Sequence, residues 1–128
     1  MWMNHVHIGV RDLERAVAFY RDVLGLEVST IPAANMAGVR VGSNLSLDLD
    51  PSLTPADNEP KPVIIGFVVE SADEAYARLK AKGVALQCEP QDQYWGVRNF
   101  YFRDPDGYTI ECAQPLVKAS GQGTAGSI

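Results

Sequence analysis

The fold is decided by HVHIGVRDLERAVAFYRDVLG at residues 5–25, where an alternating apolar run leads directly into a helical pattern. Alternation of apolar and other side chains in residues 5–10 is typical of a β-strand with one buried face. Asp12 suits the position that caps a helix start, and apolar residues then recur at helical spacing until Gly25. The stretch therefore predicts a strand followed by a helix over residues 13–24.

A second strand–helix unit follows at VIIGFVVESADEAYARLKAKG, residues 63–83. Ser71 and Glu74 match a capping box, in which two side chains satisfy free backbone donors at a helix start. Val10 aligns with Val69, 59 residues later, and the same offset aligns the apolar stripes of the two helices. The repeat predicts two related modules in one chain.

Short β-rich segments follow each predicted helix: residues 26–31, 38–41 and 44–50, then 84–88, 98–102 and 108–113. The predicted fold class is α+β, with two βαβββ modules whose curved mixed sheets form a cleft and carry their helices outside. We expect one domain over residues 1–118, with half-modules 1–50 and 63–116 and a proline-rich linker at residues 51–62. Residues 119–128, rich in Gly and Ser, are expected to be a flexible tail.

Composition excludes several classes of function. The 128 residues include 11 Lys and Arg against 16 Asp and Glu, a net charge of −5, with no basic cluster. This balance argues against nucleic-acid and membrane partners and favours neutral or cationic ligands. No apolar run approaches the roughly 18 residues of a membrane span, and the start lacks the pattern of a secretory signal. The cysteines, Cys88 and Cys112, fit a reducing cytoplasm, where we expect the protein.

Strand alternation predicts where functional side chains gather. The apolar residues of the first strand should pack under the helix, so that His5 and His7 project to the opposite face. By the same alternation Asp48 and Glu111 lie on the polar faces of their strands, and curved sheets would bring all four side chains to one cleft. Such groups can ligate a divalent metal or move protons. The alternative is that the two histidines lie on a half-exposed edge strand without a functional role, and that Glu111 is only solvated.

At both ends the sequence resembles the vicinal oxygen chelate superfamily, which includes glyoxalases, bleomycin-resistance proteins, extradiol dioxygenases and fosfomycin-resistance enzymes. The resemblance rests on HVHIGVRDL at residues 5–13, on Phe19-Tyr20 and Leu24-Gly25-Leu26, and on WGVRNFYFRDPDGYTIE at residues 95–111. It extends over nearly the whole chain apart from the tail. It implies the paired βαβββ fold and a homodimer.

The resemblance implies a metal site that this chain completes only in part. Metal-dependent members take one ligand from the first strand, one from the matching strand of the second half and a Glu from the last strand. His5 and Glu111 fit the first and last of these metal ligands. The repeat offset carries His5 onto Ile64, whose side chain cannot donate to a metal. His7 or Asp48 would have to supply the missing ligand to Fe, Mn, Ni or Zn.

Two functions are therefore predicted. The first is a metal-independent protein without a cofactor, like the bleomycin-resistance proteins, which binds a small cationic or aromatic molecule. Its expected ligand-binding residues are His7, Asp48, Tyr94, Trp95 and Arg98. Trp95 could stack on a planar ligand or only anchor its loop. The alternative is a metal-dependent glyoxalase-type lyase or isomerase, or an extradiol-type dioxygenase, with His5, His7 and Glu111 as candidate catalytic residues. A metal-free enzyme with His5 or His7 as base is a third possibility.

Overall fold

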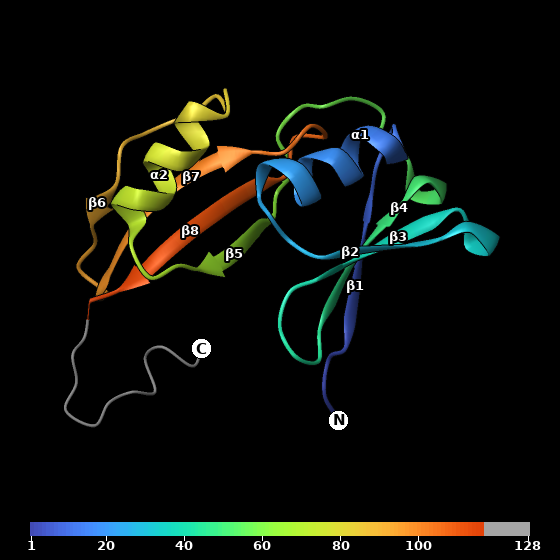
Figure 1. Ribbon diagram of the computed structural model, residues 1–128, viewed down its shortest axis with the longest axis horizontal. Helices are drawn as coiled ribbons and strands as arrows, with labels where there is room; N and C mark the ends of the chain where they lie inside the picture. The colour runs from blue at the N-terminus through green and yellow to red at the C-terminus, as the bar shows by residue number, and fades with distance from the viewer. Residues whose placement is uncertain (117–128) are drawn as a thin grey trace. The chain divides into compact units, whose positions relative to one another are not determined.

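The computed structural model describes residues 1–116, which form two compact units, each built on a four-stranded sheet (Figure 1). The first unit comprises Met1–Pro60 together with the turn Asp104–Gly107. The second comprises Lys61–Arg103 and the described residues from Tyr108 onward. The expected tail, residues 119–128, lies outside the described residues. No helix within residues 1–116 is long and apolar enough to cross a membrane.

The first sheet has the strand order β1-β4-β3-β2. Its parallel pair is β1 (His5–Gly9) with β4 (Ser46–Asp50), and β3 (Met36–Arg40) runs antiparallel to both β4 and β2 (Val28–Ile31). Short 3₁₀ turns, η2 (Pro32–Ala34) and η3 (Pro51–Leu53), follow β2 and β4. The helix α1 (Leu13–Ala18) contacts β3 and β4, as expected for a helix that covers one face of the sheet.

The first helical segment, residues 13–23, begins where the sequence predicts and ends one residue before the predicted end. The carboxylate of Asp12 accepts a hydrogen bond from the Arg15 backbone N–H at 3.1 Å, and Gly25 has a φ of +76° beyond the last turn. After α1 the chain continues as a π-helical turn, η1 (Phe19–Val23), which the apolar spacing did not distinguish from α-helix. Tyr20 is buried, and its hydroxyl donates to Asp104 at 2.6 Å, which ties the turn Asp104–Gly107 to this unit.

The second sheet has the strand order β5-β8-β7-β6. Its parallel pair is β5 (Ile64–Val68) with β8 (Thr109–Pro115), and β7 (Val97–Arg103) runs antiparallel to both β8 and β6 (Gln91–Asp92). The helix α2 (Ala72–Ala81) contacts β7 and β8 (Figure 1). Ser71 caps it as predicted, because its hydroxyl accepts a hydrogen bond from the Glu74 backbone N–H.

The prediction of a strand at residues 84–88 is wrong. That segment forms a single bridge, between Leu86 and Phe102, and the fourth strand is β6. The turn at residues 93–96, where Gly96 has a φ of +94°, folds β6 back on β7 as a hairpin and so fixes that pairing.

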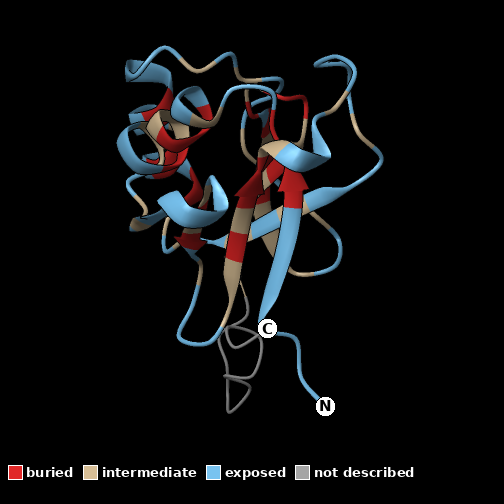
Figure 2. Cartoon of the chain, turned by 90° about the vertical axis from the view of Figure 1, so that its right-hand side faces the viewer, coloured by how far each residue is buried: buried red, intermediate tan, exposed pale blue. Residues whose placement is uncertain are grey.

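The predicted repeat is confirmed at the level of single residues. β1 and β5 are the same length, and an offset of 59 carries His5 onto Ile64 and Gly9 onto Val68. Both modules have the order βαβββ and a mixed sheet, so the predicted α+β class is confirmed. In each sheet one face supplies the core, with Val39 and Leu49 buried in the first unit and Phe100 and Ile110 in the second. The buried stretches of the chain are red in Figure 2.

Candidate functional site

The strands β1 and β4 place a row of polar side chains on one face of the first sheet. Their parallel register pairs His5 with Ser46 and His7 with Asp48. Side chains alternate along a strand, so Asp50 lies on the same face, whereas Leu47 and Leu49 are buried on the other. We call His5, His7, Ser46, Asp48 and Asp50 the His–Asp face.

His7 lies between two carboxylates. Its Nδ1 donates to Asp50 Oδ2 at 2.7 Å, and its Nε2 lies 3.4 Å from Asp48 Oδ2. The other oxygen of Asp48, Oδ1, accepts a hydrogen bond from the Ser46 hydroxyl at 2.5 Å. The His7 side chain is 33% exposed and that of Asp48 is 14% exposed, so both remain accessible to a ligand or ion.

Asp50 is a site residue that our sequence reasoning missed. Its Oδ1 accepts hydrogen bonds from the hydroxyl and the backbone N–H of Ser52, at 2.6 and 2.9 Å. The bond from the Ser52 hydroxyl, followed by the bond from His7, holds the pKa of Asp50 below its ordinary value. The signal was present in the sequence, because residues 46, 48 and 50 alternate as a single polar face.

The second histidine of β1 completes a compact cluster. His5 Nδ1 donates to Asn4 Oδ1 at 2.5 Å, and the ring centroids of His5 and His7 are 5.2 Å apart. One potential ligand atom from each of His5, His7 and Asp48 lies within 4.8 Å of the others. The structure thus brings together three of the four residues predicted to line the cleft.

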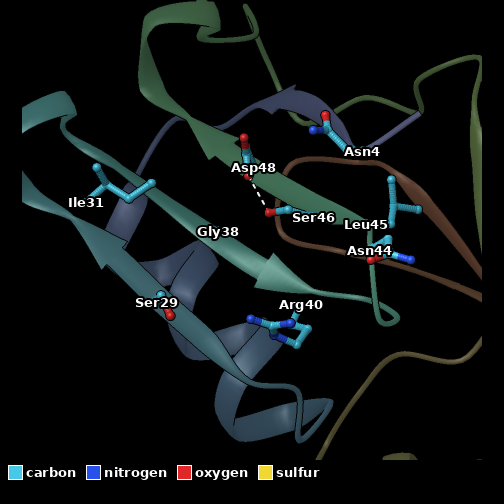
Figure 3. A pocket seen from close by; sticks show the side chains of 9 residues that line it. All are labelled: Asn4, Ser29, Ile31, Gly38, Arg40, Asn44, Leu45, Ser46 and Asp48. Carbon is cyan, nitrogen blue, oxygen red and sulfur yellow. Dashed lines mark hydrogen bonds between the residues drawn. The ribbon is translucent and has the colours of Figure 1, made fainter. Parts of the chain in front are cut away.

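A pocket of about 330 Å³ opens beside the His–Asp face and shares Ser46 and Asp48 with it (Figure 3). Its lining residues are Asn4, Ser29, Ile31, Gly38, Arg40, Asn44, Leu45, Ser46 and Asp48. A Cβ at Gly38 would lie 3.0 Å from Ser46 Oγ and 3.3 Å from Asp48 Oδ1, so the missing side chain leaves room beside the carboxylate. Arg40, whose Nε is 3.6 Å from Glu27 Oε1, adds a positive charge that our sequence reasoning also missed.

Glu111 lies on the second sheet, in a hydrogen-bond network of its own. The side-chain amide of Asn99 donates to Glu111 Oε2 at 2.8 Å and to the Tyr101 hydroxyl at 3.2 Å. Gln93 donates in turn to Asn99 Oδ1 at 3.0 Å, and Asn99 is buried. Glu111 therefore belongs to the second unit, and its place in one cleft with the His–Asp face stays a prediction.

The aromatic loop predicted to contact a ligand is the turn between β6 and β7. Tyr94 and Trp95 are both exposed there, with their rings edge to face and the ring centroids 4.9 Å apart. Arg98 lies on the other face of β7 from Asn99 and donates to Asp73 and Asp92 at 3.0 Å. The structure does not bring Arg98 to the face that holds Glu111, because the two residues have opposite parity in the β7–β8 register.

This chain has only some of the metal ligands that the resemblance implies. At the position matching His5, Ile64 is 58% exposed and offers no ligand atom. By contrast, imidazole nitrogens and a carboxylate oxygen, of the kind that hold divalent transition metals, meet on the His–Asp face. His7, hydrogen-bonded to a carboxylate, also has the arrangement of a proton carrier.

Comparisons with known proteins agree on the family. A model described as Glyoxalase/Bleomycin resistance protein/Dioxygenase superfamily matches residues 2–112. The structure is similar to a glyoxalase/bleomycin resistance protein/dioxygenase from Nocardioides, with a TM-score of 0.76, 25% identity, and coverage of 94% of this chain and 87% of that chain.

Two further relatives differ in their described activities. The metallothiol transferase FosB of Shouchella clausii is 28% identical over 118 residues, which cover 85% of this chain and 77% of that protein. TnmS3, an antibiotic binding protein from Streptomyces sp. CB03234, is 28% identical with a TM-score of 0.72, covering 90% of this chain and 96% of that one. By the family match over nearly its whole length, and by its paired βαβββ fold, this chain belongs to the glyoxalase/bleomycin resistance protein/dioxygenase superfamily.

Proposed function

We propose that this protein binds a small organic molecule in the pocket beside β4. The observation that carries the proposal is the pocket itself, which has the volume of a small-ligand site and places charged groups of both signs at its wall. Gly38 leaves the space open next to Asp48. The similarity to TnmS3, described as an antibiotic binding protein, supports ligand binding as a use of this fold.

The lining of the pocket indicates the chemistry of the ligand. Asp48 is an acceptor, so a cationic or hydrogen-bond-donating group is favoured beside it. Ile31 and Leu45 offer apolar contact to a ring or an alkyl group, and Arg40 can donate hydrogen bonds to an acceptor on the ligand. The overall charge of −5 adds a weak preference for cations. Tyr94 and Trp95 remain predicted contacts.

Thermal unfolding in the presence of a panel of small aromatic cations, each paired with its neutral analogue, tests the proposal. A ligand at 100 times its Kd stabilises the folded state by about 2.7 kcal/mol. Stabilisation by cations that is lost in Gly38→Ala and kept in Gly66→Ala would support the pocket. Each glycine faces a carboxylate, but a Cβ at Gly66 meets only an ordinary contact, 3.4 Å from Glu111 Oε1. Equal stabilisation of both variants would reject this pocket as the site.

A second candidate function is that of a metal-dependent enzyme of the superfamily. It is favoured by the closeness of His5, His7 and Asp48 and by the similarity to a metallothiol transferase. A divalent ion held by these residues would supply Lewis-acid chemistry, and Asp50 would orient His7 through the hydrogen bond that it accepts from Nδ1.

The two candidate functions are separated by following a ligand from the panel by mass spectrometry with Mn²⁺, Fe²⁺, Ni²⁺, Zn²⁺ or chelator present. Conversion of the ligand only with metal would favour the enzyme. An unchanged ligand under every condition would favour the binding protein.

We also propose that the protein is a cytoplasmic homodimer. Ile64 and Val68 on β5 are exposed in the single chain, and exposed apolar side chains grouped on a strand favour association. Both cysteines are free, which is compatible with a reducing compartment. Size-exclusion chromatography with light scattering tests the dimer, and a monomer mass at micromolar concentration would contradict it. Cell fractionation tests the compartment.

A further inference from the structure

The His–Asp face holds one imidazole in a fixed orientation. Because Asp50 is an acceptor, the hydrogen bond of 2.7 Å requires the proton of neutral His7 to be on Nδ1. The lone pair of Nε2 then points away from Asp50, on the side where Asp48 Oδ2 lies. A carboxylate behind a ligating histidine is the usual way in which proteins orient such a ligand for a metal.

The distance between His7 Nε2 and Asp48 Oδ2 is informative. At 3.4 Å it exceeds an ordinary N–H···O hydrogen bond. Two ligands that each lie about 2.0–2.1 Å from a tetrahedral ion are separated by about 3.3–3.4 Å. The Ser46 hydroxyl occupies only Asp48 Oδ1, so Oδ2 retains its lone pairs for an ion. This pair is therefore spaced as two metal ligands are.

His5 supplies the third ligand. Its Nδ1 donates to Asn4, which leaves the Nε2 lone pair free of that bond. The side chain is exposed, and one of its ring nitrogens lies within 4.8 Å of ligand atoms of His7 and Asp48, so a change in ring orientation can bring Nε2 to the ion. Two imidazoles and one carboxylate, with other coordination positions open, suit Zn²⁺, Fe²⁺, Mn²⁺ or Ni²⁺.

We propose that the first unit binds a divalent transition-metal ion by itself, through His5, His7 and Asp48, with Asp50 as the positioning residue behind His7. This site differs from the pattern implied by the family resemblance, which draws ligands from both modules through Glu111 and the position of Ile64. The inference does not rest on the proposed pocket ligand, because the ion needs no organic molecule to bind. Its location beside Asp48 puts the ion at the edge of the pocket.

The test is a titration of the full chain, stripped of metal by dialysis against a chelator, with Co²⁺ followed by visible absorption and with Zn²⁺ in competition. We expect a single ion per chain. Asp48→Asn and His7→Gln should each weaken binding by about 100-fold or more, a larger effect than losing a partner behind a ligand, since each replaces a strong ligand by a neutral amide. Asp50→Asn should weaken it by about 10–100-fold, the usual effect of losing the partner of a ligating histidine. Asp57→Asn, the same chemical change on a loop of the same unit, should leave affinity unchanged.

Two variants of the second unit decide where the ion lies. Under our proposal Glu111→Gln leaves the affinity for Co²⁺ unchanged, and Ile64→His does not raise it. If Glu111→Gln weakens binding as much as Asp48→Asn does, or if Ile64→His strengthens it about 10-fold or more, the two-module site is correct and our proposal fails. Failure of the wild-type chain to bind Co²⁺ or Zn²⁺ overturns it as well. Circular dichroism of each stripped variant verifies that the fold is kept.

Discussion

The two sheets repeat a topology without repeating its chemistry. In each module the third residue of the first strand pairs with a carboxylate residue, His7 with Asp48 in the first sheet and Gly66 with Glu111 in the second. The carboxylate is thus present twice, but the imidazole only once. Duplicated backbone geometry therefore preserves positions, while the residue types at those positions assign the chemistry to one copy.

The two sheets also differ in what a glycine beside the carboxylate does. Gly38 on β3 faces Ser46 and Asp48 across the sheet, and its missing side chain leaves pocket space. Gly66 occupies the position that His7 holds in the first module, beside Glu111. Gly38 makes room for a ligand next to the His–Asp face. Gly66 stands at the position where the first module has the imidazole of His7.

The largest expected effects come from the cores, where the two modules should behave alike. Leu49 and Phe100 are fully buried under the helix-covered faces of their sheets. Leu49→Ala should lower the free energy of unfolding by about 2–5 kcal/mol and Phe100→Ala by about 3–5 kcal/mol, because each leaves a cavity. Urea unfolding measures both. A loss below about 1 kcal/mol in one variant only would mean that the modules differ in their cores and not only in their polar faces.

A smaller effect should distinguish the polar faces. Asp50 accepts hydrogen bonds from His7 and twice from Ser52, whereas Glu111 accepts one from Asn99. Asp50→Ala removes three hydrogen bonds to one carboxylate and Glu111→Ala removes one, so we expect the larger loss of stability in Asp50→Ala. The measurement is again urea unfolding at neutral pH. The reverse ranking would place the structurally important carboxylate in the second sheet.

The loss of free energy of unfolding at acidic pH should depend in part on Asp50. The folded state lowers its pKa, so the ionised form stabilises the fold above the ordinary value of about 3.9, and this contribution is lost as pH falls through the lower folded-state pKa. Ser52→Ala removes the largest cause of that shift and should reduce the loss of stability on acidification. The free energy of unfolding, measured between neutral and acidic pH, tests this. An unchanged loss of stability on acidification in both Ser52→Ala and Asp50→Asn would assign the acid sensitivity to other carboxylates.

The sequence was sufficient for features that depend on local pattern. Alternation in β1 and helical spacing after Asp12 predicted the first strand and helix, and an apolar run followed by a capping box predicted the second strand–helix unit, 59 residues later. The same alternation placed His5, His7 and Asp48 on one face. Such features need only a strand period or a helix cap, which single segments encode.

The sequence did not predict features that depend on which strands pair with one another. Residues 84–88 have the composition of a strand, but a hairpin turn gives the place beside β7 to Gln91 and Asp92. Alternation was enough to place Asp50 on the polar face, but the hydrogen bond that it accepts from His7 depends on the register of two strands. The pocket likewise combines Arg40 with residues of neighbouring strands, and register across a sheet is not written in any one segment.

The smallest expected effect concerns which face of β8 is buried, since the correspondence of Glu111 with Asp48 depends on it. Burial raises the pKa of Cys112 to about 11, whereas Cys88 is exposed. A thiol reagent at neutral to mildly alkaline pH should therefore modify Cys88 in the folded protein and reach Cys112 only after unfolding, because the thiolate is the reactive form. The Cys88→Ser variant should be unreactive until urea is added. Rapid modification of Cys112 in that variant would mean that β8 presents the opposite face, so that Glu111 would point into the core and would no longer correspond to Asp48.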